Sequence, residues 1–317
     1  MKIVCMEPLG VALVKIEELA APLRIAGHEF IYYEQKETDE GKLLKRVEDA
    51  DIIMLANQPL KAAVIEACPK LKFIDIAFTG VDHVALDAAR RRGIICSNAA
   101  GYSTNAVAEL VFGLAVSVTR NIVPCDGRCR AAATKDGLVG FELFGKTFGV
   151  IGTGAIGSRV VKIAAAFGCK VVAYSRTKKQ ELINAGVEYV ELDELLGAAD
   201  FISLHVPLTE ATRGLIGKEA IARMKQGAVV INTSRGPVVD SEALAEALKD
   251  GHIAGAGIDV FEIEPPIAKD HPLCNAPHTV LTPHVAFASK EALEKRAEIV
   301  FENIAAYLAG KPANIVK

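Results

Sequence analysis

The chain has 317 residues, enough for two average domains, and its content of 51% apolar and 24% charged residues excludes a disordered protein. Its 36 Lys and Arg residues nearly balance 39 Asp and Glu residues, which argues against nucleic acid or an anionic membrane surface as the main partner. We therefore expect a globular protein whose partner is a small molecule.

The start of the chain and its apolar stretches indicate a cytoplasmic protein with no membrane partner. The chain opens into the strand-like KIVCM, without the order of charged, apolar and small residues of a signal peptide. No run of 18 apolar residues exists, because even AVAELVFGLAVSV contains Glu109. The seven cysteines are scattered, and the one close pair, Cys125 and Cys129, has no second pair to complete a zinc site, so no metal is expected.

Residues 1–98 alternate short apolar runs with helical segments and predict a small α/β unit. Its strand candidates are KIVCM, HEFIYY, DIIMLA, KFIDIAF and GIICSN. From residue 146 the alternation is more regular, and the strand candidates are TFGVIG, KVVAY, ADFISLHV, GAVVINTS, GAGIDV and HTVLTPH. Because these runs are largely apolar, as strands buried on both faces are, they predict a parallel, doubly wound sheet of the Rossmann type.

Two helices help to place the domain boundaries. Residues 155–167 carry apolar side chains at helical spacing, and Gly168 is a typical C-terminal stop. Residues 289–310 form one amphipathic helix after the last strand, and we expect it to cross back to the first unit. We therefore expect residues 1–98 and 288–317 to form a substrate domain, and residues 99–287 a nucleotide domain.

The sequence GTGAIG at 152–157 matches the GxGxxG pattern of dinucleotide-binding loops. It stands between a strand and a helix, the context that the pattern requires, so that glycines allow a tight turn and close approach of a pyrophosphate to backbone N–H groups. We expect a dinucleotide to contact Gly152, Gly154, Ala155, Ile156 and Gly157. A glycine turn that serves only packing is the alternative.

The strand KVVAY ends without the carboxylate that normally holds the 2′-hydroxyl of an adenosine ribose. Ser175, Arg176, Thr177 and Lys178 follow instead. A 2′-phosphate is repelled by a carboxylate and held by a guanidinium group and hydroxyl donors, so these residues favour NADP, with NAD still possible. A solvated basic turn without a ligand is the alternative.

A second cluster lies in INTSRGPVVD, GIDVFEIEPP and LTPHVAF, which place Arg235, Glu264 and His284 after three strand candidates. Ligands bind at the carboxyl ends of parallel strands, so these side chains are expected to converge. Arg235 is suited to hold a substrate carboxylate, His284 to protonate a developing alkoxide, and Glu264 to favour the charged imidazole. This set fits reduction of a 2-oxo acid, although each residue by itself is more often structural.

The ordered motifs GTGAIG, NTSRG, DVFEIEP and PH resemble the D-isomer-specific 2-hydroxyacid dehydrogenase family along essentially the whole chain. The resemblance implies that Arg235, Glu264 and His284 are catalytic, and that Asp259 lies near the nicotinamide amide. It further implies a homodimer assembled through residues 120–146, and a flavodoxin-like substrate domain. The remaining implied contacts are His205, Val206, Pro207, Thr212, Thr233 and Ser234 with the cofactor, and Thr79, Gly80 and Val81 with the substrate.

Departures from the family pattern bear on the cofactor and the substrate. NAD-dependent members carry an acid where Ser175 stands, and Phe287 replaces a common tryptophan after the catalytic histidine. The loop GVDHVALD is similar to that of glyoxylate and hydroxypyruvate reductases, which favours a small 2-oxo acid over a larger one. Thr79 replaces the lysine of the related phosphite dehydrogenases. A dinucleotide-sensing scaffold like the C-terminal-binding corepressors is the alternative that is not an enzyme.

Overall fold

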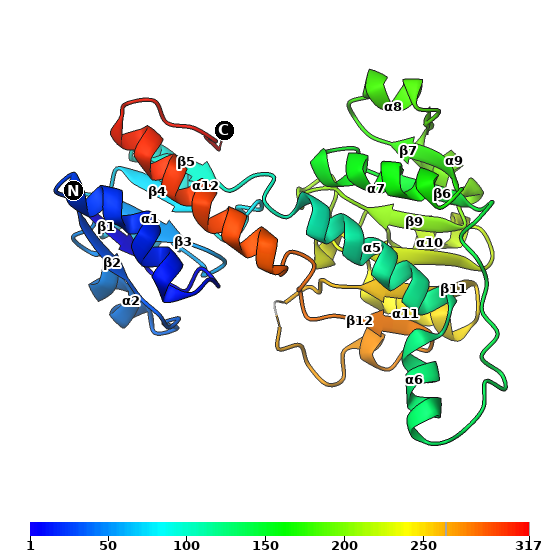
Figure 1. Ribbon diagram of the computed structural model, residues 1–317. Coiled ribbons are helices and arrows are strands. Elements are labelled where there is room, and N and C mark those ends of the chain that lie inside the picture. The colour runs from blue at the N-terminus through cyan, green and yellow to red at the C-terminus, as the bar shows by residue number, and fades with distance from the viewer. Residues whose placement is uncertain (264, 317) are drawn as a thin grey trace. The chain divides into compact units, whose positions relative to one another are not determined.

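The computed structural model describes residues 1–263 and 265–316, and the chain divides into two compact units (Figure 1). The N-terminal unit consists of Met1–Ser103 and the segment from Ala288 onward, and the central unit is Thr104–Phe287. The sequence placed these boundaries near residues 99 and 287.

The N-terminal unit contains a parallel sheet of five strands in the order β2-β1-β3-β4-β5. The strands are β1 (Lys2–Cys5), β2 (Glu29–Tyr32), β3 (Ile52–Leu55), β4 (Phe73–Ile76) and β5 (Ile95–Asn98). Every residue of β3 and β4 is buried, as expected for central strands covered on both faces. This strand order is that of flavodoxin-like folds, in which the chain reverses direction across the sheet between β1 and β3.

Five helices accompany this sheet: α1 (Leu13–Ile25), α2 (Glu40–Val47), α3 (Ala62–Glu66), α4 (Leu86–Arg91) and α12 (Lys290–Leu308). The last helix, drawn in red and orange in Figure 1, packs against α1 and β4. Ser289 caps it by accepting a hydrogen bond from the Ala292 N–H at 3.1 Å. Asn303 of α12 donates to the buried carboxyl of Asp75 in β4 at 3.0 Å, so the C-terminal helix is part of this unit's core.

The central unit contains a parallel sheet of seven strands in the order β12-β11-β10-β9-β6-β7-β8. The strands are β6 (Thr147–Ile151), β7 (Lys170–Tyr174), β8 (Glu188–Tyr189), β9 (Phe201–Leu204), β10 (Ala228–Asn232), β11 (Ile253–Ile258) and β12 (Thr279–Leu281). Sequence patterning missed only β8 among them, because two residues are too few to show a periodicity. The chain reverses direction at β6, between β7 and β9.

Two apolar cores lie on opposite faces of this sheet, because successive strand side chains point to opposite sides. Phe148 and Val150 of β6 belong to a cluster that includes residues of α5 and α7, whereas Ile151 belongs to one that includes residues of α9 and α11. Figure 1 shows α5 and α7 together on one face of the sheet. The bounds are α5 (Thr104–Thr119), α7 (Ala155–Ala166), α8 (Gln180–Asn184), α9 (Leu192–Ala198), α10 (Lys218–Arg223) and α11 (Ser241–Lys249).

Helix α6 (Ile122–Arg130) differs from the other long helices because it buries no side chain. It contains Cys125 and Cys129, both free thiols. Within the described part of the chain, no helix is by itself long and apolar enough to cross a membrane. Only α5 and α6 together reach that length and composition, and they are bent by 60°.

Candidate active site

The parallel strands of the central unit end at one edge of the sheet, and the loops that follow them carry most of the predicted site residues. The glycine loop follows β6, the Ser175 loop follows β7, and His205 follows β9. Arg235, Asp259 and His284 follow β10, β11 and β12, which are neighbours in the sheet. The edge therefore has one half suited to a dinucleotide and another half that carries a cation and an imidazole.

The glycine loop is shaped by close backbone approaches. Gly152 has a φ of +95°, and a Cβ there would lie 2.5 Å from the carbonyl oxygen of His205. A Cβ on Gly157 would lie 1.9 Å from the carbonyl oxygen of Gly152. Gly154, in contrast, has no neighbouring atom within 4 Å of a Cβ position. The first and third glycines close the turn, and the second leaves room for a pyrophosphate at the start of α7.

A cavity of about 370 Å³ opens beside this loop. It brings together nine of the predicted residues: Gly152, Gly154, Ser175, Arg176, Thr177, His205, Val206, Pro207 and Thr212. The other lining residues are not among those predicted, and they are Thr153, Tyr174, Lys179, Thr209, Ala211 and Leu215. Ala155, Ile156, Thr233 and Ser234 lie in the adjoining helix or loop and do not line it.

The cation that lines the cavity beside Arg176 is Lys179, and not the predicted Lys178. The ammonium group of Lys179 donates to the Ser158 hydroxyl at 2.9 Å and lies 3.5 Å from the Gly154 carbonyl oxygen. The side chain of Lys178 is exposed and does not line the cavity. Both lysines fit a basic turn, so composition does not separate them, and the difference lies in the direction in which the turn projects each side chain.

His205 is a neutral histidine at the centre of the edge. Burial lowers its pKa to about 3. Its Nε2 shares a hydrogen bond of 2.8 Å with the hydroxyl of Ser203, which is fully buried. A group with this pKa carries no charge near neutral pH, so His205 is unsuited to act as an imidazolium acid.

The loop that carries Arg235 is organised by Asn232, the last residue of β10. Its Oδ1 accepts hydrogen bonds from the N–H and the hydroxyl of Ser234 at 3.0 and 2.8 Å, and its Nδ2 donates to the Arg235 carbonyl at 2.9 Å. Gly236 follows, and a Cβ there would lie 1.9 Å from the carbonyl carbon of Phe261. The NTSRG motif thus encodes a turn that fits tightly against the loop after β11.

Asp259 fixes the backbone around His284. One carboxylate oxygen accepts from the Thr282 hydroxyl at 2.5 Å and the Val285 N–H at 2.9 Å, and the other accepts from the Ala286 N–H at 2.9 Å. Burial raises the pKa of Asp259, and these hydrogen bonds lower it in part. His284 has a φ of +55°, which is uncommon outside glycine, and its N–H donates to the Asp259 carbonyl at 2.8 Å. The family resemblance implied that Asp259 lies near the nicotinamide, and nothing in the sequence indicated these hydrogen bonds.

Two predicted groups remain. Glu264 lies outside the described residues. In the N-terminal unit, Thr79, Gly80 and Val81 follow β4, and the carbonyl of Thr79 accepts a hydrogen bond from the Asn98 side chain at 2.8 Å.

In the central unit, Thr233 is buried, and its hydroxyl has no hydrogen-bond partner among the described residues. That hydroxyl is therefore available to a ligand at this edge.

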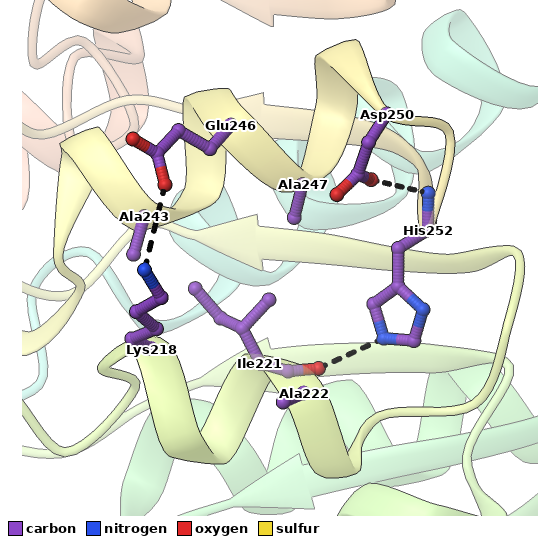
Figure 2. Close-up of a pocket in the computed structure, with 8 residues that line it drawn as sticks. All are labelled: Lys218, Ile221, Ala222, Ala243, Glu246, Ala247, Asp250 and His252. Carbon is purple, nitrogen blue, oxygen red and sulfur yellow. Dashed lines mark hydrogen bonds and ion pairs between the residues drawn. The ribbon is translucent and has the colours of Figure 1, made fainter.

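A second cavity, of about 300 Å³, lies between α10 and α11 (Figure 2). Its polar groups already bind one another: Asp250 accepts from the His252 N–H at 2.8 Å, and Nε2 of His252 lies 3.0 Å from the Ile221 carbonyl oxygen. Lys218 and Glu246 form a long ion pair of 3.9 Å at the exposed rim. None of the predicted site residues lines it, and we place the candidate site at the strand ends.

The sequence model for the family described as D-isomer specific 2-hydroxyacid dehydrogenase, NAD binding domain, matches residues 112–286. The chain belongs to this family. It is 41% identical over 282 residues to a glyoxylate reductase of Korarchaeum cryptofilum, covering 86% of this chain and 85% of that protein. It is 40% identical to a D-3-phosphoglycerate dehydrogenase of Methanocaldococcus jannaschii, covering 99% of this chain and 59% of that protein.

Solved structures agree with this assignment. The structure of an acyclic imino acid reductase (Bsp5) in complex with NADPH and D-Arg matches with a TM-score of 0.90 and 32% identity, covering both chains completely. The predicted fold class, the family and the expectation of an enzyme are confirmed. The protein is thus an oxidoreductase of this family, and its central unit is an NAD(P)-binding domain.

Proposed function

We propose that the protein reduces a small 2-oxo acid of the glyoxylate or hydroxypyruvate type to the D-2-hydroxy acid, with NADPH preferred over NADH. The observation that carries the proposal is the distribution of groups along one strand edge. The dinucleotide cavity lies at β6, β7 and β9, and Arg235 and His284 follow the neighbouring strands β10 and β12. A relative named glyoxylate reductase supports the substrate class.

The proposed mechanism assigns one task to each side chain. NADPH, when bound, supplies the hydride to the oxo carbon. Arg235 holds the substrate carboxylate in a bidentate grip, and His284 donates a proton to the oxygen that becomes the hydroxyl. Asp259 keeps His284 in place through the bonds at residues 282–286. Glu264 is proposed, from the sequence alone, to favour the charged imidazole.

His284 is preferred over His205 as the acid because of their surroundings. A histidine that donates a proton must be protonated at the working pH, whereas burial lowers the pKa of His205 to about 3. We assign His205 to the wall of the cofactor cavity, beside Val206 and Pro207. In this role a neutral ring contributes packing and a hydrogen bond to Ser203.

The preference for NADPH rests on the cations and hydroxyls at the end of β7. Ser175, Arg176 and Thr177 line the cavity together with Lys179, and no described acidic side chain lines it. The cavity thus fits a 2′-phosphate better than a free 2′-hydroxyl, which is normally held by a carboxylate. The Thr233 hydroxyl, which has no hydrogen-bond partner among the described residues, and the open space at Gly154 also fit a bound dinucleotide.

We also propose a homodimer that forms through residues 120–146. This segment exposes large apolar side chains, with Val139 83% and Phe144 75% exposed, and helix α6 adds Ile122 and Val123. Exposed apolar side chains gathered along one segment are typical of an interaction surface. Light scattering coupled to size exclusion will report a dimer if this is right, and a monomer at all concentrations contradicts it.

A steady-state assay tests the proposed reaction. The panel contains glyoxylate, hydroxypyruvate, pyruvate and phenylpyruvate, each with NADPH and with NADH, and the chirality of the product is determined for the last three acids, because the glycolate formed from glyoxylate is achiral. We expect glyoxylate and hydroxypyruvate to have the highest kcat/KM with NADPH. Higher kcat/KM for phenylpyruvate would indicate the larger-substrate alternative, and cofactor binding without turnover of any oxo acid would indicate a dinucleotide-sensing scaffold.

A further inference from the structure

The glycine loop after β6 and the basic turn after β7, residues 175–179, are tied together by Tyr189 of the short strand β8. Tyr189 pairs with Ala173 of β7, and its partly buried ring packs against the apolar cluster that includes residues of α7. Helix α7 begins at Ala155, within the glycine loop. The tyrosine hydroxyl therefore lies where it contacts both segments of the cofactor cavity.

The hydroxyl of Tyr189 is the middle of a chain of hydrogen bonds that begins and ends in the basic turn. It accepts from the Lys179 N–H at 3.2 Å and donates to the Thr153 hydroxyl at 3.0 Å. The Thr153 hydroxyl in turn lies 3.5 Å from the Thr177 carbonyl oxygen. Because a hydroxyl can accept one hydrogen bond while it donates another, every group in the chain has a consistent role. The chain holds the backbone of residues 177–179 against the glycine loop.

The side chain of Lys179 is held at the same loop by a second chain. Its ammonium group donates to the Ser158 hydroxyl at 2.9 Å, and this hydroxyl donates to the Thr153 carbonyl at 3.0 Å. Thr153 and Ser158 are buried, so hydrogen bonds to them are stronger than at an exposed surface. An ammonium group has three N–H donors, and Ser158 and Gly154 engage at most two of them. Lys179 thus keeps a donor for a ligand.

Tyr189 does not itself line the cofactor cavity. Thr153, Thr177 and Lys179 line it, whereas Tyr189 and Ser158 do not. Any effect of Tyr189 on the cofactor must therefore pass through the residues that it holds, and Lys179 is the charged one among them. A cation binds a phosphate more strongly than a hydroxyl, so the position of Lys179 matters more for a 2′-phosphate than for a free 2′-hydroxyl.

We infer that Tyr189 is a positioning residue for NADPH, which holds the turn so that Lys179 faces the 2′-phosphate and thereby adds to the preference for NADPH over NADH. The physical basis is preorganisation, because a turn that is already fixed loses less conformational entropy when the phosphate binds. The same contacts give a reason why Lys179, and not Lys178, lines the cavity. This inference rests on the proposed function, because it concerns the proposed preference for NADPH.

The test compares Tyr189→Phe with the unmodified protein by fluorescence titration with NADPH and with NADH. Phenylalanine keeps the ring and its packing and removes only the hydroxyl. The Kd for NADPH is expected to rise roughly two- to tenfold, the range that corresponds to one neutral hydrogen bond. The Kd for NADH is expected to stay within about twofold, which a general loss of structure in the cavity would not allow.

A double-mutant cycle with Lys179→Ala separates positioning of the charge from other effects of the hydroxyl. In the Lys179→Ala background, Tyr189→Phe is expected to leave the Kd for NADPH within about twofold, because the charge that Tyr189 positions is gone. Tyr33→Phe is the control. It makes the same change in the N-terminal unit, which contains none of the residues that line the cavity, and it should change neither Kd.

Three results overturn the inference and leave the proposed function standing. Tyr189→Phe could weaken NADPH and NADH equally, it could change neither Kd, or it could weaken NADPH by the same factor with and without Lys179. In each case the unmodified protein still binds NADPH more tightly than NADH. If the unmodified protein instead binds NADH at least as tightly as NADPH, the proposed cofactor preference fails, and the inference fails with it.

Discussion

The two units use the same kind of parallel sheet but place their polar side chains differently. In the central unit, Arg235 and His284 lie in partly exposed loops beyond the strand ends, in turns shaped by glycines and by Asp259. In the N-terminal unit, Glu7 and Asp75 are fully buried. The central unit's site thus depends on backbone shape, and the N-terminal unit's polar groups depend on individual buried contacts.

The largest effect is expected for His284→Ala in the central unit. General acid catalysis contributes on the order of 10²–10⁴-fold, so kcat for the 2-oxo acid should fall by about that factor. Binding of NADPH, measured by fluorescence titration, should be unchanged. The control is His205→Asn, which should retain the pH dependence of the unmodified enzyme between about pH 5 and 9, because an imidazole with a pKa of about 3 stays uncharged throughout that range. Normal kcat in His284→Ala would contradict the assignment.

Gly236→Ala tests whether the activity of the central site depends on the backbone shape of the loop that carries Arg235. Its Cβ would lie 1.9 Å from the Phe261 carbonyl carbon, so the loop that carries Arg235 must move. Misplacement by about 1 Å can cost on the order of 10²-fold, and we expect a loss of this size in kcat/KM. Gly113→Ala, in helix α5, meets its neighbour at an ordinary 3.8 Å and should leave kcat/KM unchanged. Equal activity of both variants would show that the close approach is unimportant.

Arg176→Ala addresses the cofactor cavity of the same unit. A charge-assisted hydrogen bond contributes roughly 1.5–3 kcal/mol, so the Kd for NADPH should rise by about ten- to a hundredfold, while that for NADH changes little. Lys179→Ala should shift the same preference in the same direction, because Lys179 lines the cavity. Lys178→Ala is the matched control. Equal weakening of both cofactors by Arg176→Ala would instead indicate a structural role.

Asp75→Asn examines the buried polar groups of the N-terminal unit and should give the smallest effect. Burial raises the pKa of Asp75 well above its usual range, and the hydrogen bond from the Asn303 side chain offsets part of this rise in pKa. The stability that this group contributes is therefore present below its unfolded pKa of about 3.9, and is lost as the pH rises through the folded value. Asparagine does not ionise. The variant's Tm relative to the unmodified protein should increase by several degrees from pH 4 to pH 8, and a constant difference would refute this.

Much of the fold and part of the site were predictable because they follow from local patterns. Apolar runs predicted every strand but β8, and Gly168 with its φ of +77° marks the predicted helix end. GTGAIG and NTSRG were recognisable because a Cβ at Gly157 or Gly236 would meet backbone within 2 Å. Such a steric requirement leaves no choice of residue, so it is visible in the sequence itself.

Only the tertiary structure decided which of several suitable side chains lies in each position. The basic turn offers Lys178 and Lys179, and the path of the chain places Lys179 in the cavity. The motifs implied a place near the nicotinamide for Asp259, and the structure adds that its oxygens hold residues 282–286. Glu7 gave no signal, because its partners at residues 56 and 58 are about 50 positions away along the chain. Hydrogen bonds between distant segments depend on how strands are paired, which no local pattern encodes.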